Sequence, residues 1–333
     1  MVQRQRSPSG PLEIDFTAED VARTRFAISP LWEVVAGIRV LKGADGHAMH
    51  RRWADEVRPR LAAAKLDLTP LTSLVVVPTT TIPGFLVPPP ATPQPSLDLE
   101  LAVLRATPPE LLRTSSPDTR AAVAALREDP GRGLGRLADA IAGYWEIAVA
   151  PYWPGILALL EADIAHRARQ FAEGGAEALL AGLDPQVTWD SGALQIPHCR
   201  LRGIRRLDGR GLLLVPSAFV WPRIFSVIGY DQWQPTLRYP PRGVATLWEG
   251  RTRPCPSALA GVLGRTRALL LAELDAPAST TELARRTGHS PGGVSQHLTA
   301  LRSAGLVSGH RMGRTVFYAR TRVGEALVQG CDP

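Results

Sequence analysis

The chain has 333 residues, enough for two or three domains with substantial cores, and its 45% apolar and 21% charged residues are typical of globular proteins. The net charge is +7, of which residues 258–333 carry +4, nine arginines less five acidic residues, and this concentration favours a polyanionic partner for the C-terminal part. The sequence shows neither an apolar run of about 18 residues nor a secretory signal, and Cys199, Cys255 and Cys331 are isolated, so we expect no membrane span, no disulfide framework and a cytoplasmic location.

The first 66 residues predict a short strand followed by three helices. Apolar and acidic residues alternate over 12–16, which favours a strand. Thr17 is an N-cap for a helix that we expect to end near Ala27, and Ser29, followed by a proline, begins the next helix. A third helix is expected over 49–66, so the opening of the chain is mostly helical.

The segment 78–95 contains seven prolines, three of them consecutive. Such a segment cannot form a regular helix or a central strand. We therefore expect an extended linker or loop across a surface. The alternative, a proline motif that binds a partner domain, lacks a flanking basic anchor.

From residue 96 to residue 182 the pattern is helical again. The expected helices cover 97–105, 108–112, 117–127, 134–150 and 154–174. In the last of them an apolar stripe is formed by Leu157, Leu160, Ile164, Ala168 and Phe171. The opposite side is charged and holds Asp163, His166 and Arg167. No third ligand lies at helical spacing from His166, so we expect a solvated face and no metal site there.

The segment 186–239 has the character of strands and turns. The expected strands cover 187–189, 193–196, 211–215 and 236–239. The pair Asp208-Gly209 is a typical hairpin turn. Together these signals predict a small antiparallel sheet.

The same part of the chain is rich in aromatic residues. Six of the eight tryptophans fall between Trp145 and Trp248. Such side chains are candidates to line an apolar pocket with polar handles, and the alternative is that they fill a core. The candidate ligand-binding residues are Trp145, Trp153, Trp189, Trp221 and Tyr230.

The recurrent motifs of enzymes are missing from the sequence. It contains no P-loop, no Gly-x-Ser-x-Gly, no His-Glu-x-x-His and no dinucleotide fingerprint after a strand. His198 lies beside Cys199, but the pair has no evident third partner. We therefore expect no catalytic residue, no metal and no cofactor, and hence no enzyme.

A helix expected from Ser257 to about Leu274 is apolar on more than one side. A helix of this kind is buried on two faces. One face would contact the segment that follows. The other face, together with a final helix over 321–329, is a candidate dimer contact.

Two short helices with strong end signals follow. Ser279 and Glu282 have the spacing of a capping box, and Gly288 can supply the left-handed turn that ends the first helix. Ser290 is the N-cap of the second helix, with a proline at its first position, and Gly305 ends it. Two helices joined by a tight turn with glycine form a helix-turn-helix.

The second of these helices, 291–304, has one apolar stripe, formed by Val294, Leu298 and Leu301. Its outward residues are mostly small and polar, which suits contact with base edges in the major groove. Two strands, 306–310 and 315–320, then form a hairpin with basic residues at its tip. This arrangement predicts a wing that lies against phosphate or in the minor groove.

Two stretches carry a resemblance to a known family. The pattern Ser-x-x-Gly-Val-Ser-Gln-His-Leu-x-x-Leu-Arg-x-Ala-Gly-Leu-Val, from Ser290 to Val307, resembles the recognition-helix signature of ArsR-type winged helix-turn-helix regulators. The Gly-Arg-x-x-x-Tyr run from Gly313 is similar to the wing of that family. The resemblance implies a bacterial transcription regulator that binds operator DNA as a homodimer, commonly a repressor released by an inducer. Metal-sensing members carry a Cys-x-Cys pair on the first helix of the motif, and Thr281 to Arg285 has none, so that metal site is absent.

We therefore predict an α+β, mainly helical protein. Residues 1–250 are expected to form an N-terminal regulatory domain of helices and a small sheet, and 255–333 a C-terminal winged helix-turn-helix domain. The expected function is sequence-specific binding of operator DNA by a homodimeric repressor, under the control of a small-molecule effector of the N-terminal domain, in the cytoplasm at the nucleoid. The predicted DNA-binding residues are Thr281, Ser290, Gly293, Ser295, Gln296, His297, Thr299, Arg302, Arg311 and Arg314. Two alternatives stand beside this hypothesis, a winged helix that binds a protein and an enzyme with an appended winged helix.

Overall fold

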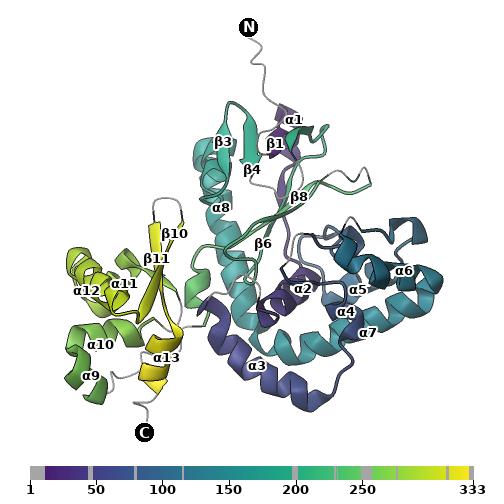
Figure 1. Cartoon of the computed structure of the whole chain (residues 1–333). Helices are drawn as coiled ribbons and strands as arrows, with labels where there is room; N and C mark the ends of the chain where they lie inside the picture. Colours follow the sequence, from purple (N-terminus) through teal and green to yellow (C-terminus); the bar gives the residue numbers. More distant parts are fainter. Residues whose placement is uncertain are drawn as a thin grey trace. The chain divides into compact units, whose positions relative to one another are not determined.

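The computed structural model describes residues 12–43, 48–78, 81–114, 116–196, 202–228, 230, 232–248, 257–274, 277–312 and 315–329 (Figure 1). The chain divides into two compact units. Unit 1 consists of Met1–Asp45 and Val57–Arg242, and unit 2 of Gly46–Glu56 and Gly243–Pro333.

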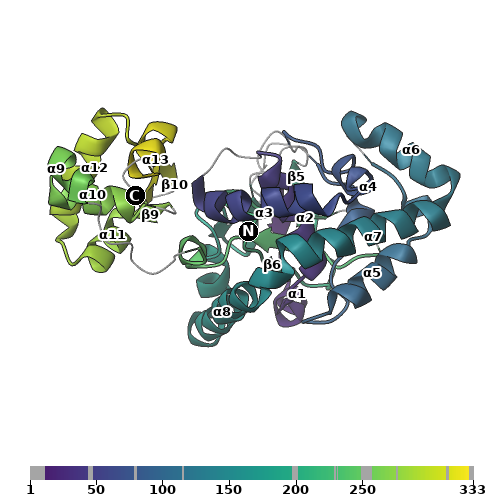
Figure 2. The same cartoon turned by 90° about the horizontal axis from the view of Figure 1, so that it is seen from below.

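Unit 1 holds most of the helices, as its composition predicts. Its helices are α1 (Ala18–Arg23), α2 (Pro30–Leu41), α4 (Thr69–Thr72), α5 (Leu97–Arg105), α6 (Arg120–Glu128), α7 (Pro130–Ala148) and α8 (Trp153–Ala181). Short 3-10 turns are η3 (Gly84–Leu86), η4 (Pro109–Leu111), η5 (Pro117–Thr119) and η6 (Ala150–Tyr152). Helix α3 (Arg51–Ala64) contributes its first residues to unit 2 and the rest to unit 1. Helices α5 and α7 lie side by side in unit 1 (Figure 2).

In the part of the chain that the structure describes, no single helix is both long and apolar enough to cross a membrane. The bent pair Pro130–Ala148 and Ala150–Ala181 passes that test jointly, by length and composition alone, with an angle of 43° between its parts.

The strands of unit 1 form two sheets of four strands each. The first has the order β3-β4-β1-β5 and the second the order β2-β6-β8-β7. The strands are β1 (Leu12–Asp15), β2 (Arg25–Phe26), β3 (Thr188–Asp190), β4 (Ala193–Ile196), β5 (Gly203–Arg206), β6 (Leu213–Pro216), β7 (Phe225–Val227) and β8 (Thr236–Tyr239). The mainly helical α+β class is confirmed. The sheet differs from the expectation, because there are two sheets and both are mixed.

The mixed character comes from pairing over long sequence distances. Strand β1 pairs antiparallel with β4 and parallel with β5, and β2 pairs parallel with β6, which in turn pairs parallel with β8. The turn at Asp208 and Gly209, with φ of 52° and 74°, therefore joins strands of different sheets. The expected hairpin at this turn is wrong, because β5 and β6 find partners elsewhere in the chain.

The first helix is shorter than its sequence pattern suggests. Thr17 is the N-cap and forms a full capping box with Asp20, but α1 ends at Arg23 rather than near Ala27. Thr24 is extended, and its Oγ1 donates a hydrogen bond of 2.8 Å to the Asp20 carbonyl oxygen. The chain leaves the helix at this point because the next two residues pair with β6.

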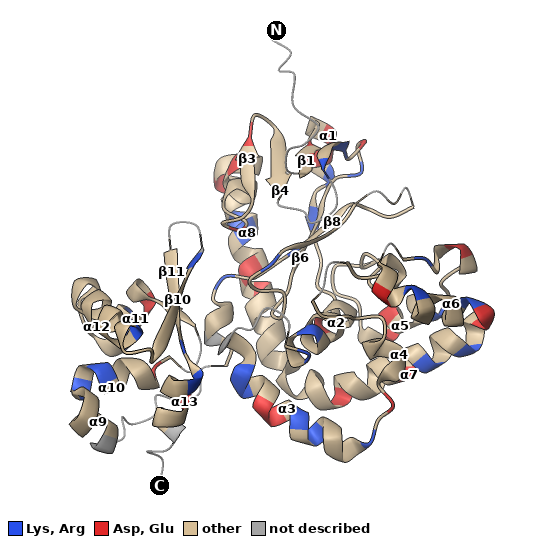
Figure 3. Cartoon of the chain, in the orientation of Figure 1, with Lys and Arg blue, Asp and Glu red and all other residues tan. Residues whose placement is uncertain are grey.

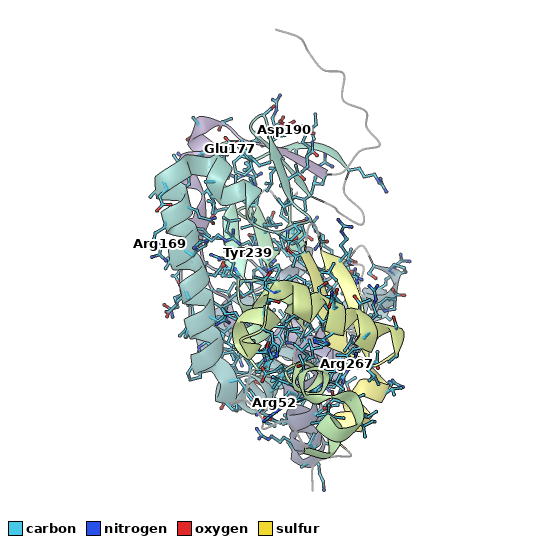
Figure 4. The ribbon with its side chains drawn as sticks, turned by 90° about the vertical axis from the view of Figure 1, so that its left-hand side faces the viewer. Arg52, Arg169, Glu177, Asp190, Tyr239 and Arg267 are labelled. Carbon is cyan, nitrogen blue, oxygen red and sulfur yellow. The ribbon has the colours of Figure 1, made fainter. Side chains whose placement is uncertain are left out.

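Helix α8 buries a different stripe from the expected one. Its buried side includes Leu160, Asp163 and Arg167, whereas Ala168 and Phe171 of the predicted stripe are exposed. The Asp163 carboxylate accepts a hydrogen bond of 2.8 Å from the Tyr239 hydroxyl and pairs with the Arg167 guanidinium at 3.6 Å. A bond to the sheet has thus set the orientation of the helix against its apolar pattern. Figure 4 shows Tyr239 beside α8.

The proline-rich segment is irregular, as expected, but the prediction that it crosses a surface is wrong for its middle part, whereas residues 91–94 are exposed. Residues 83–88 are buried, with Phe85 1% and Leu86 0% exposed. A buried loop must satisfy its backbone N–H groups, and prolines have none, so the segment carries fewer donors into the interior. The Val87 carbonyl accepts from Arg238 Nη2 at 2.8 Å, and the Pro93 carbonyl accepts from the Ile28 amide at 2.8 Å.

Two carboxylic acids are buried at the start of α2. Glu33 accepts hydrogen bonds from the amides of Ala218 and Phe219, at 3.1 and 3.4 Å. Glu100, from α5, accepts from the Ser29 hydroxyl at 2.6 Å and the Leu31 amide at 2.7 Å. Burial raises the pKa of Glu33 to about 8 and that of Glu100 to about 7.

Unit 2 contains a small three-stranded sheet among helices. Its elements are η2 (Ala48–His50), η7 (Val244–Thr246), α9 (Ser257–Leu263), α10 (Arg265–Ala272), β9 (Ala278–Ser279), α11 (Thr280–Thr287), α12 (Pro291–Ser303), β10 (Val307–Met312), β11 (Thr315–Arg320) and α13 (Arg322–Gln329). The single helix expected over 257–274 is two helices, because Gly264 has a φ of 82° and breaks it.

A segment from early in the chain is part of unit 2. The Trp248 Nε1 donates a hydrogen bond of 2.8 Å to His50 Nδ1, and Arg51 Nη1 lies 2.9 Å from the Glu325 carboxylate. The η2 turn also contacts β11. The η2 turn and the start of α3 are therefore bound to the C-terminal residues by a hydrogen bond between aromatic side chains, an ion pair and contacts with β11.

The buried acid at Glu33 predicts how stability depends on pH. Between pH 4.5, the ordinary pKa, and about 8, the folded protein holds a proton that the unfolded chain has lost. The free energy of unfolding therefore falls as the pH rises through this window, by an amount on the order of a few kcal/mol for this group. We expect Glu33→Gln, which cannot ionise and keeps one carbonyl acceptor in place of the two oxygens that Ala218 and Phe219 contact, to reduce this fall.

Urea unfolding of wild type and variant at pH 5.5, 7 and 8.5 measures the effect. The exposed Glu146→Gln on α7 is the control and should leave the profile of the wild type unchanged. A Glu33→Gln profile parallel to that of the wild type would contradict the assignment of the proton to Glu33.

Candidate nucleic-acid interface

The two central helices of unit 2, α11 and α12, begin and end at the residues that the sequence predicts as caps. The Ser279 hydroxyl accepts from the Glu282 amide, and the Ser290 hydroxyl accepts from the Gly293 amide, both at 3.2 Å. Gly288 follows α11 in the left-handed conformation, with φ of 72°. The predicted N-caps and the turn between the helices are therefore present.

Helix α12 ends in a pattern of two hydrogen bonds. The Gly305 amide, at a φ of 69°, donates to the Arg302 carbonyl, and the Leu306 amide donates to the Leu301 carbonyl at 2.9 Å. This is a Schellman motif, and it leads the chain directly into β10.

The predicted apolar stripe of α12 is confirmed. Val294, Leu298 and Leu301 are at most 1% exposed and pack in the core of unit 2 with residues of α10 and α11. Ser295 and Thr299 are exposed on the other side, one turn apart, and Gln296 is exposed beside them. The burial of these three side chains therefore determines which side of α12 faces the solvent.

The hairpin after α12 has the form of a wing. Strand β10 pairs antiparallel with β11 from Val307↔Arg320 to Met312↔Thr315. Strand β9 pairs with the other edge of β11, so that Ser279, the N-cap of α11, lies opposite Phe317. The Arg302 guanidinium lies beside β10, since a Cβ built on Gly309 would be 3.7 Å from Arg302 Nη1. The wing and the two helices are therefore one packed arrangement.

Ion pairs with arginines hold two acidic side chains of unit 2 away from the surface. Glu273 accepts two contacts from Arg286, at 2.7 and 3.1 Å, and Glu325 lies 3.0 Å from Arg320 Nε and 2.9 Å from Arg51. The exposed arginines of the C-terminal part are Arg265, Arg267, Arg285, Arg302, Arg311 and Arg322. Figure 3 shows the basic residues of α10. The outward charge of this described part is thus mainly positive, which favours a polyanion.

The structure locates nine of the ten predicted DNA-binding residues. Seven of them are exposed and two, Gly293 and His297, are partly buried. The Ser290 hydroxyl is used as a cap, and the Thr299 hydroxyl donates 2.9 Å to the Ser295 carbonyl, so both act first on their own helix. Arg314 lies outside the described residues, as do Cys199, Cys255, Cys331 and His198. That these residues contact DNA stays a prediction.

Sequence reasoning left out two exposed residues of this region. Arg267 lies on α10, two residues after Arg265, and His310 lies on β10 directly before Arg311. The available sequence signals were the position of Arg267 close to Arg265 and that of His310 within a basic hairpin.

The five aromatic residues predicted to bind a ligand lie on several different elements. Trp145 and Trp153 contact each other, with ring centroids 5.0 Å apart, at the junction of α7 and α8. Trp189 contacts Phe16 in the first sheet, and Tyr230 contacts Trp233 in the loop before β8. These ring contacts are pairs at three different places in unit 1, and ligand binding by these residues stays a prediction. Among the described residues, no group of three His, Cys, Asp or Glu side chains is placed to hold a metal ion.

Comparisons with known proteins match two parts of the chain. Residues 268–308 match the family described as "Bacterial regulatory protein, arsR family", and residues 110–245 match a family of unknown function, DUF5937. The solved structure "Reduced HlyU from Vibrio cholerae N16961" is 35% identical over 22% of this chain and 84% of its own, with a TM-score of 0.19. No curated protein matches the chain.

The Ser290 cap gives a test of how α12 is held. Ser290→Ala removes the acceptor for the Gly293 amide, and we expect a loss of about 1 kcal/mol in the free energy of unfolding of unit 2. Ser295→Ala on the exposed side of the same helix is the matched control, and it should change stability by less than about 0.5 kcal/mol. Urea unfolding followed by circular dichroism and tryptophan fluorescence measures both. Equal losses in the two variants would show that the hydroxyl does not act as a cap.

Proposed function

Because the chain belongs, through its C-terminal domain, to the arsR family of bacterial regulatory proteins, we propose that it represses transcription as a homodimer on an operator and that a small molecule bound by unit 1 controls it. The family membership makes the chain a DNA-binding transcription regulator. The proposal places it in the cytoplasm, at the nucleoid, and assigns it no catalytic reaction.

The observation that carries the proposal is the contrast between the two sides of α12. One side is held by three buried residues, and the other presents Ser295, Gln296 and Thr299 to solvent. Short polar side chains on an exposed helix suit the major groove, where each base pair offers its own pattern of donors and acceptors. In the proposed complex, α12 enters the major groove with these residues at base edges.

The arginines around this helix supply the non-specific part of the binding. Arg302 lies between α12 and the wing, and Arg311 lies near the tip of the wing. Because the acids Glu273 and Glu325 are paired with other arginines, they do not offset this charge. Contacts of guanidinium groups with phosphates release counterions, so binding should weaken steeply as salt rises.

Two exposed apolar residues support the homodimer. Val262 on α9 is 80% exposed and Val323 on α13 is 60% exposed, and both helices pack against α10. A dimer formed through α9 and α13 would bury both valines. It would also present two copies of α12 to half-sites about one DNA turn, ~34 Å, apart.

Control by a ligand requires that the ligand bind two states of the protein with different affinity. A coupling of about 1–3 kcal/mol is usual between two such sites. Unit 1 is the larger unit, and its interior contains ionisable groups that a ligand could contact, which supports it as the place of binding.

Separate variants test base contacts and phosphate contacts. Gln296→Ala should cost about 1–3 kcal/mol on operator DNA and little on a random duplex. Arg311→Ala should weaken both complexes alike and lower the salt slope by about one. Arg127→Ala in unit 1 removes the same charge from an exposed position and is the control. Fluorescence anisotropy with DNA from upstream of the gene, across a salt series, measures all three.

The DNA-binding proposal fails if the wild type binds neither duplex, or if Arg311→Ala behaves like Arg127→Ala. Gln296 would be a backbone contact if its substitution weakened both complexes equally.

The dimer is tested by introducing charge at the two valines. We expect the wild type to sediment as a dimer at micromolar concentration and Val262→Glu/Val323→Glu to sediment as a monomer, because two glutamates would have to be buried in each half of the contact. Val103→Glu, at a 41% exposed site of unit 1, should remain dimeric. A monomeric wild type, or a dimeric double variant, would contradict this interface.

A further inference from the structure

Two arginines and two aromatic rings alternate on one side of the second sheet of unit 1. The Arg238 Cζ atom lies 4.5 Å from the centroid of the Trp32 ring, and the Arg39 Cζ atom lies 4.5 Å from the centroid of the Phe225 ring. The two rings are in contact, with centroids 5.3 Å apart. We call Trp32, Arg39, Phe225 and Arg238 the arginine–aromatic layer.

The backbone explains why these four residues meet. Phe225 and Arg238 are register partners on β7 and β8, so their side chains share one face of the sheet. Trp32 and Arg39 are seven residues apart on α2, about two turns, so they share one side of that helix. The layer is therefore the contact between α2 and the sheet.

The layer is buried, but some of its N–H groups have no hydrogen-bond acceptor among the described residues. Trp32 and Arg238 are each 1% exposed. Arg238 Nη2 donates to the Val87 carbonyl, whereas Arg238 Nε and Nη1 and the Trp32 Nε1 have no hydrogen-bond partner among the described residues. Buried N–H groups of this kind are nearly always bonded, and three of them beside one cation call for an acceptor.

The carboxylic acids nearby do not supply that acceptor. Both oxygens of Glu100 are bonded to Ser29 and Leu31, and both oxygens of Glu33 face the amides of Ala218 and Phe219. Their raised pKa values, about 7 and about 8, mean that at neutral pH the two acids together carry less than two negative charges. Burial lowers the pKa of Arg238 to about 10, so it stays charged. Glu100, the acid that interacts electrostatically with Arg238, therefore balances the charge of Arg238 only in part at neutral pH.

We propose that the arginine–aromatic layer binds a small organic monocarboxylate, whose carboxylate accepts hydrogen bonds from Arg238 and the Trp32 indole and whose apolar body lies against the rings of Trp32 and Phe225. A carboxylate offers several acceptor positions to guanidinium and indole donors. An inorganic phosphate would bring more charge and no apolar part to match the rings. One carboxylate would balance the remaining charge of Arg238, and one apolar group would cover the aromatic faces.

Binding in a closed layer has a consequence for the protein. The ligand must bind a conformation in which α2 and the sheet have separated enough to admit it, so it favours that conformation over the closed one. That this change alters DNA affinity rests on the proposed function, whereas the binding itself does not.

The test is isothermal titration calorimetry of the full chain at pH 7 and constant ionic strength. The probes are formate, acetate and benzoate, each against its neutral amide, formamide, acetamide and benzamide, with inorganic phosphate as a further arm. We expect at least one carboxylate to bind one per chain, about tenfold or more tightly than its amide and than phosphate, because a hydrogen bond to a charged group is lost with the amide.

Variants locate the binding. Arg238→Met should abolish it, and Trp32→Phe, which keeps an aromatic ring but removes the N–H donor and part of the indole, should weaken it about tenfold. Trp32→Phe keeps the test decisive if Arg238→Met fails to fold, and circular dichroism checks each variant. Arg105→Met, which removes an exposed arginine paired with Asp139, should bind like the wild type.

The proposal is wrong if none of the three carboxylates binds more tightly than about 10 mM. It is also wrong if amides or phosphate bind as well as the carboxylates, or if a folded Trp32→Phe keeps full affinity. Anisotropy with operator DNA then separates the two proposals. Carboxylate binding with unchanged DNA affinity keeps the site and removes its regulatory role, and an absence of DNA binding overturns the proposed function without affecting the calorimetry.

Discussion

The fold of unit 1 depends on the pairing of β1 and β2, within residues 12–26, with strands that come almost 200 residues later. Strand β1 lies in the middle of one sheet, between β4 and β5, and β2 forms the edge of the other beside β6. Leu12 and Ile14 are completely buried in the shared core. The segment 110–245 that matches a family of unknown function therefore lacks a central strand of its own sheet. It needs β1 to complete the first sheet. Because this pairing joins distant parts of the sequence, we expect the unit to fold as a whole.

The second sheet of unit 1 has buried charged groups on both faces, and these groups are paired on one face but not fully on the other. Successive residues of β8 point to opposite sides. On the side of α8, Tyr239 donates to Asp163, which also pairs with Arg167, so charges there cancel within the protein. On the side of α2, Arg238 has one carbonyl acceptor and a ring. An internal pair that is complete serves the packing of a helix, whereas a cation with unused donors is suited to a ligand.

The sequence predicts the local elements well and the long-range ones poorly, for physical reasons. Helices with side-chain caps, such as α5 and α12, begin directly after a serine. The serine hydroxyl accepts a hydrogen bond from the amide three residues later, so this signal is local in the sequence. The buried side of α8 followed a hydrogen bond to Tyr239, about 75 residues away, which no periodicity can show. Prolines break regular structure, and this property predicts a loop at the surface for the proline-rich segment. Residues 83–88 are buried nonetheless, and prolines lower the cost of burying a loop because they have no N–H group to satisfy. The candidate interface was predictable because its caps, stripe and hairpin are all local signals.

In unit 2 the residues that would specify a base sequence are separate from those that would supply affinity. Ser295, Gln296 and Thr299 lie on a helix whose orientation is fixed by caps and three buried residues, and none of them takes part in the core. Of the exposed arginines only Arg302, in the last turn of α12, shares this helix, and Glu273 and Glu325 are paired with Arg286 and Arg320. Substitutions on the exposed side of α12 can therefore change sequence preference without loss of stability or of phosphate contacts. A domain with this division can be turned to a new operator by few substitutions, while the buried ion pairs preserve its general attraction to DNA.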